Sequence, residues 1–211
     1  MLYIDFHTHH VPVEENVVAV VDGRDTWGVH PWNSLPQPFQ GRGDSRQLIV
    51  PPSFGELGGG FLAIGECGLD ALRGPSLAVQ EDVFLQQIRL SEAVRKPLII
   101  HCVKALDRLL QLHKEQQPTM PWMFHGFRGK PQQLRSLLDN GFFVSFGHSY
   151  NDESLCLCPL DRMMLETDDH FCPISEIYND VAKKRGLEVE VLCKAMAENY
   201  QTFFQNTPLQ T

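Results

Sequence analysis

The segment PLIIHC, residues 97–102, lies between two helical patterns and decides the fold class. It is a continuous apolar run that ends on a histidine, as in parallel strands that are covered on both faces. In residues 77–95, apolar side chains fall on one helical face, and Pro97 ends that helix. Residues 105–115 carry a second helical pattern. A strand between two helices predicts a βα unit of a parallel sheet.

The same pattern continues along the chain. The apolar runs are LYIDFH (2–7), FLAIGE (61–66), PWMFHG (121–126), FFVSFG (142–147) and MMLETD (163–168), with weaker candidates in VVAVV (17–21) and TWGVHP (26–31). Further helices are predicted over 131–140, from 174 to about 186, and from about 188 onward. In a chain of 211 residues, this alternation favours a compact (β/α) barrel over a doubly wound sheet. The Gly- and Pro-rich stretch 51–60 predicts a turn-rich connection, and residues 1–211 are expected to form a single barrel domain.

Composition narrows the possible partners. The chain has 18 Lys plus Arg against 26 Asp plus Glu, a net charge of −8, which argues against broad clamping of nucleic acid by a basic surface. Two divalent ions in one cleft would halve that charge. There is no apolar stretch of ~20 residues and no signal-peptide pattern. The six cysteines are expected to be reduced thiols, so we expect a cytoplasmic protein without membrane association or an evident obligate partner.

Residues able to bind metal fall at the ends of the predicted strands. In a barrel, the C-terminal strand ends converge on the face that carries the active site. Side chains at i and i+2 of an extended strand point to one side, so His7 and His9 can share an ion. Imidazole and carboxylate ligands suit zinc, manganese, nickel, iron or magnesium, and Glu66 could bridge two such ions. The predicted ligands are His7, His9, Glu66, His101, His125 and Asp168.

The motifs and their order resemble those of TatD-family metal-dependent hydrolases. They are IDFHTHH (4–10), WGVHPW (27–32), AIGECGLD (63–70), IIHC (99–102), FHGFRG (124–129) and LETDD (165–169). The resemblance implies a TIM-like barrel, one or two divalent metal ions on the six ligands above, and hydrolysis of phosphodiester bonds, typically in DNA.

The chain departs from the family pattern in several places. Only sixteen residues separate His10 from Trp27, so one or two N-terminal βα units must be abbreviated and the barrel distorted. The family usually has an Arg–Asp pair after its third histidine, whereas Val103 and Lys104 follow Cys102 here. His170 stands where a proline is usual. These changes affect residues expected to contact substrate, while the metal ligands are retained.

The implied mechanism assigns a role to each remaining candidate. A metal ion lowers the pKa of its bound water from ~15.7 towards ~7, which supplies hydroxide at neutral pH. Asp168 and Glu66 are the predicted catalytic residues, with Asp168 also able to accept the proton of the water. Lys104 and Arg128 are predicted substrate contacts that stabilise charge on the phosphate.

Several side chains keep two interpretations. His30 is either a partner to the metal ligands or a substrate contact, or else a structural histidine at a strand end. Trp32 is either a base-stacking platform or an ordinary rim or core side chain. Glu166 is a candidate helper because it lies two residues before Asp168. His148 and His170 are expected to be loop histidines.

Three functions stay open from the sequence. The leading one is a metal-dependent phosphodiesterase acting on DNA. The second is hydrolysis of a small phosphoester, amide or ester on the same metal site. The third is a non-catalytic metal-binding protein on a trimmed barrel.

Overall fold

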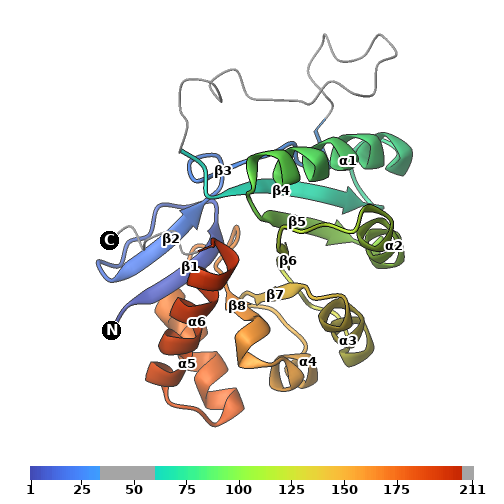
Figure 1. The fold of residues 1–211 in the computed structure, drawn as a ribbon. Coiled ribbons are helices and arrows are strands. Elements are labelled where there is room, and N and C mark those ends of the chain that lie inside the picture. Colours follow the sequence, from blue (N-terminus) through green and yellow to red (C-terminus); the bar gives the residue numbers. More distant parts are fainter. Residues whose placement is uncertain (34–59, 206–211) are drawn as a thin grey trace.

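The computed structural model describes residues 1–33 and 60–205 (Figure 1). The strands are β1 (Tyr3–Thr8), β2 (Val17–Val21), β3 (Thr26–Trp27), β4 (Ala63–Asp70), β5 (Leu98–Val103), β6 (Trp122–Phe124), β7 (Phe143–Phe146) and β8 (Met163–Leu165). The helices are α1 (Leu77–Val94), α2 (Leu106–Gln116), α3 (Pro131–Asp139), α4 (Asp152–Leu157), α5 (Ile174–Arg185) and α6 (Val189–Phe203), with a 3-10 turn at Leu160–Arg162. From β4 onward, strands and helices alternate as predicted.

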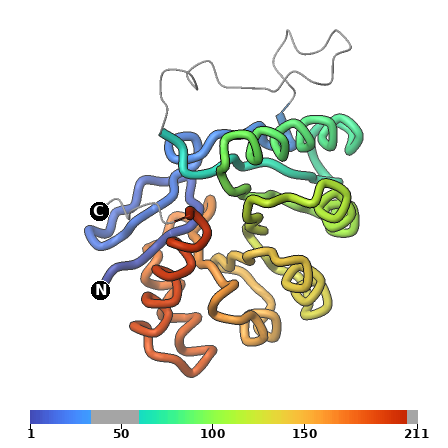
Figure 2. The backbone as a smooth tube through the Cα atoms, in the orientation of Figure 1, coloured from blue at the N-terminus to red at the C-terminus, as the bar shows by residue number. Residues whose placement is uncertain are grey.

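All strand pairs are parallel. Strands β3 to β8 form a six-stranded sheet in chain order, and β1 pairs with β2. The two sheets meet through a bridge between Thr8 and Asp168, where the His9 N–H donates to the Asp168 carbonyl at 3.0 Å. The strands therefore follow one another around a curved sheet with the helices outside it (Figures 1 and 2). The prediction of a distorted TIM-like barrel is confirmed.

The distortion lies at the N-terminal strands. Parallel neighbours normally need a crossover of about a dozen residues, usually helical. Here residues 9–16 join β1 to β2 without a helix, and a turn at 22–25 joins β2 to β3, closed by the Asp25 N–H bonding to the Val21 carbonyl at 2.8 Å. The abbreviated N-terminal βα units are thus confirmed. The stretch 51–60 lies outside the described residues, except for Gly60.

Local sequence explains where the helices begin and end. Pro131 opens α3, as its fixed φ and missing N–H suit a first turn. Gly186 ends α5 in the left-handed conformation at φ 64°. The short α4 was not predicted, since its six residues are too few for a clear apolar period. Its signal is the cap at Asn151, whose side chain accepts the Ser154 N–H at 2.9 Å.

The core holds β1 firmly in place. Phe6 is fully buried and its ring packs against Tyr200 of α6 at 6.3 Å. The hydroxyl of Tyr178 on α5 accepts the Ile4 N–H at 3.1 Å and donates to the Ile4 carbonyl at 3.0 Å. The two C-terminal helices therefore fix the strand that carries His7. In the described part of the chain, no helix combines the length and the apolar character needed to cross a membrane, and all six cysteines are free.

Candidate metal centre

The other five predicted ligands and His30 gather around the Glu66 carboxylate. Each of its oxygens faces a different set of imidazoles. Oε1 lies 2.6 Å from His7 Nε2 and 3.0 Å from His9 Nε2. Oε2 lies 3.0 Å from His30 Nε2, 3.4 Å from His125 Nε2 and 3.6 Å from His101 Nδ1. Glu66 is therefore the common neighbour of five histidines.

Asp168 completes the group on the His7 side. Its Oδ1 lies 3.7 Å from His7 Nε2 and 3.6 Å from His9 Nε2. The backbone positions it, because the Asp168 N–H donates to the His7 carbonyl at 3.0 Å. Residues more than 150 positions apart in sequence thus share one site, as predicted.

The strand positions explain most of this convergence, with one correction. His7 lies in β1 and His101 in β5, while His125 and Asp168 follow β6 and β8. Glu66, however, was expected at the end of a strand, and it lies in the middle of β4. The strand continues to Asp70 because "AIGECGLD" is buried throughout and pairs with β5 as far as Val103.

The donor set fits a divalent ion. Donor atoms of His7, Glu66, His125 and Asp168 lie within 4.8 Å of one another, and so do those of His30, Glu66 and His101. His125 Nε2, which faces Glu66 at 3.4 Å, is buried without a well-formed hydrogen bond. Buried polar atoms are normally paired, so an unpartnered imidazole nitrogen aimed at this group is the arrangement expected of a metal ligand.

The charges in this group shift the pKa values of several of its members. Burial would raise the pKa of Glu66, but His125, His30 and His7 lower it well below its ordinary value, so the carboxylate is ionised. Burial and the charge of His125 lower the pKa of His101 to about 4, which leaves a neutral imidazole able to donate a lone pair. Burial and the charge of Glu166 raise the pKa of Asp168.

Two carboxylates support the histidines from outside the group. Asp70 was not singled out from the sequence, and its Oδ2 lies 3.2 Å from His101 Nε2 and accepts the Trp32 indole N–H at 2.6 Å. The available signal was its spacing from Glu66, since i and i+4 of a strand share a side. Glu166, the candidate helper, lies fully buried with Oε1 3.5 Å from His125 Nδ1.

A cleft of about 1420 Å³ opens over this group. The predicted substrate contacts Lys104, Arg128 and His30 all line it. Trp32 is a rim side chain, 43% exposed, with the Arg73 guanidinium 4.7 Å from its ring centroid. His148 and His170 do not line the cleft and stack on each other at 3.9 Å, as expected of loop histidines.

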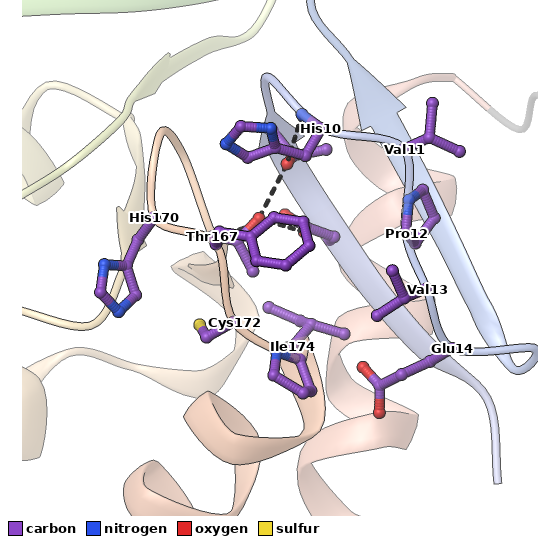
Figure 3. Close-up of a pocket in the computed structure, with 13 residues that line it drawn as sticks. His10, Val11, Pro12, Val13, Glu14, Thr167, His170, Cys172 and Ile174 are labelled. Carbon is purple, nitrogen blue, oxygen red and sulfur yellow. Dashed lines mark hydrogen bonds between the residues drawn. The ribbon is translucent and has the colours of Figure 1, made fainter.

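A second, small pocket of about 50 Å³ lies beside β1 (Figure 3). Its wall contains the buried Asp5, which accepts the Thr167 N–H at 3.0 Å and the Thr167 hydroxyl at 2.6 Å. These bonds tie β1 to the segment that carries Asp168. Burial raises the pKa of Asp5 to about 7, although the Thr167 bonds oppose the shift.

Comparisons with known proteins agree on one family. Residues 21–205 match the family described as TatD related DNase. A protein named "3'-5' ssDNA/RNA exonuclease TatD" from Cronobacter turicensis is 33% identical over 153 residues, covering 68% of this chain and 56% of that protein. "Uncharacterized metal-dependent hydrolase YcfH" of Escherichia coli K12 is 30% identical over 199 residues, covering 84% of this chain and 72% of that protein.

Solved structures share the fold. The crystal structure of the TatD homologue YJJV from Escherichia coli K12 superposes with a TM-score of 0.68 at 20% identity, covering 93% of this chain and 79% of that one. The chain spans 56%, 62% and 65% of the length of three relatives named as TatD exonucleases. On the family match and the YcfH identity together, the chain belongs to the TatD related DNase family.

Proposed function

We propose that this protein hydrolyses phosphodiester bonds of nucleic acid with two divalent metal ions that share Glu66. The observation that carries the proposal is the division of the imidazoles between the two Glu66 oxygens. His7, His9 and Asp168 would hold one ion on the Oε1 side. His101 and His125 would hold the other on the Oε2 side, where His30 also lies. Bound metal would activate the attacking water and would offset charge on the phosphate.

The chain's own side chains complete the reaction. Asp168 would accept the proton of the attacking water at its carboxylate, and its raised pKa suits that task. Lys104 and Arg128, which line the cleft, would contact phosphate oxygens of the substrate strand. Of the two functional roles expected for His30, its 3.0 Å distance to Glu66 favours a partner to the metal ligands over a substrate contact.

Relatives support a nucleic-acid substrate. Several are named "3'-5' ssDNA/RNA exonuclease TatD", which favours single-stranded DNA or RNA over a small ester. Exonuclease activity is only a proposal for this chain, because the chain spans only part of the length of these relatives.

The first experiment measures the metal content of the purified protein and its hydrolysis of bis-p-nitrophenyl phosphate with added manganese or zinc. Two equivalents of metal and turnover that is lost in Asp168→Ala and His7→Ala, with the fold intact by circular dichroism, would support the proposal. Metal without turnover of the diester would favour a small monoester, amide or ester substrate, or a non-catalytic role. A protein that binds no divalent metal would refute it.

A further inference from the structure

We propose that nucleotide phosphates flanking the scissile bond bind along one half of the cleft rim, at Lys104, Arg128 and Lys130. We name these three residues the cationic rim. The inference rests on the proposed function and specifies the path of the substrate. It implies a polynucleotide substrate rather than an isolated diester.

The cationic rim comes from two neighbouring connections. Lys104 lies between β5 and α2, and Arg128 and Lys130 lie between β6 and α3. β5 pairs directly with β6, so the two connections are adjacent at the same edge of the sheet. All three side chains are exposed, and all three residues line the cleft that opens over Glu66.

These cations are available to a ligand. Within residues 1–33 and 60–205, none of the three lies in an ion pair with a carboxylate. The two other basic residues that line the cleft differ, because Arg108 pairs with Glu81 and Glu115, and the Arg73 guanidinium lies over the Trp32 ring. Three cations without a carboxylate partner in the described part of the chain thus lie beside the candidate metal site of a protein whose net charge is −8.

The acidic side chains lie at a different part of the rim. Asp22 follows β2, and Asp168 and Asp169 follow β8, so the acidic lining lies at the β2 and β8 connections. Figure 1 shows β5, β6, α2 and α3 grouped on one side of the molecule and β1 and β2 on another. Asp107, at the start of α2, is the exception on the basic side.

This asymmetry sets a direction for the substrate. A polyanion is attracted by the cationic rim and repelled by the carboxylates of Asp22 and Asp169. The strand would therefore extend from the metal group towards α2 and α3. Exposed cations that contact phosphates contribute affinity without reading base sequence.

The test uses the metal-loaded protein and a fluorescent phosphorothioate DNA single strand of about 12 nucleotides. Binding is followed by anisotropy at several salt concentrations. Each of Lys104→Ala, Arg128→Ala and Lys130→Ala is expected to weaken binding by about three- to tenfold and to reduce the slope of log K against log salt by about 0.7.

Controls come from the same helices. Lys114 of α2 and Arg135 of α3 are exposed but do not line the cleft, so Lys114→Ala and Arg135→Ala are expected to leave affinity and salt slope unchanged. Hydrolysis of an unmodified strand is also compared with hydrolysis of bis-p-nitrophenyl phosphate. The rim variants should lose about tenfold more kcat/KM on the strand than on the small diester.

The outcomes separate the two proposals. Unchanged salt slopes in the rim variants, or equal losses on both substrates, would overturn the cationic rim while leaving the hydrolase intact. A wild-type protein that hydrolyses neither substrate would overturn the proposed function itself. Slopes that fall equally in the Lys114 and Arg135 variants would attribute binding to general surface charge, and would also overturn the rim.

Discussion

The Glu166 carboxylate lies behind His125, with Oε1 3.5 Å from His125 Nδ1, while the other ring nitrogen of His125 faces Glu66 at 3.4 Å. The imidazole thus sits between two carboxylates that are both buried. Glu166 is itself held, because its Oε1 accepts the Gly126 N–H at 2.5 Å. A carboxylate behind a metal-binding histidine fixes the tautomer and orientation of the ring.

Glu166→Gln should therefore weaken metal binding without removing a ligand. We expect a loss of about 10- to 100-fold in affinity, the usual effect of removing such a partner. The measurement is competition with a chromogenic chelator at pH 7.5, alongside thermal unfolding of the metal-free variant. Glu153→Gln, an exposed change on α4, is the matched control. Equal affinities in wild type and Glu166→Gln would contradict the role.

Asp70 supports the other side of the site. Its Oδ2 lies 3.2 Å from His101 Nε2, and its Oδ1 accepts the Leu72 N–H at 2.7 Å. Asp70→Asn should lower the affinity for the ion on the Oε2 side of Glu66 and spare the other. Metal analysis after dialysis should then give about one equivalent where wild type keeps two. The control is Asp82→Asn on the exposed face of α1, and an unchanged stoichiometry in Asp70→Asn would contradict this assignment.

Sequence patterns predicted the elements that are long or fully buried. The helices at 77–95, 131–140 and 174–186 match α1, α3 and α5 closely, because each has a clear apolar stripe and a Pro or Gly boundary. The weaker candidate 26–31 is a strand only over Thr26–Trp27. Strand ends depend on pairing with neighbours, which single-sequence patterns do not contain.

The sequence predicted the metal ligands better than the residues that support them. All six predicted ligands gather at one place, because five of them lie near or just after the C-terminal end of a parallel strand and Glu66 faces them from the middle of β4. Asp70 escaped notice because the predicted strand stopped at Glu66. The ligand roles, the single domain and the cytoplasmic location stay predictions.

The bond between Thr167 and Asp5 should contribute to stability. Asp5 is 3% exposed and receives both the backbone N–H and the hydroxyl of Thr167. Thr167→Val keeps the shape but removes the hydroxyl donor, leaving a buried carboxylate short of a partner. We expect a loss of about 1–3 kcal/mol in the free energy of unfolding, measured with urea in the presence of EDTA. Thr167→Ser should restore most of it, and a Val variant as stable as wild type would contradict the argument.

A pH effect on stability is expected from His113, which is not among the predicted metal ligands. Its ring on α2 packs at 4.8 Å from both Trp122 and Phe142, and burial lowers the pKa of this imidazole. The folded chain therefore favours the neutral ring, and the unfolded chain takes up a proton more readily as pH falls below about 6.5. The contribution of His113 is complete above that pH and is lost on acidification.

His113→Phe keeps an aromatic ring but cannot be protonated, so its stability relative to wild type should rise as the pH is lowered from 7.5 to 5.5. Urea unfolding of both proteins at the two pH values, with EDTA present, tests this. The other histidines are common to both proteins, so their effects on stability cancel in the comparison. A difference in stability between the two proteins that does not change with pH would contradict the prediction, because His113 would then titrate alike in the folded and unfolded states.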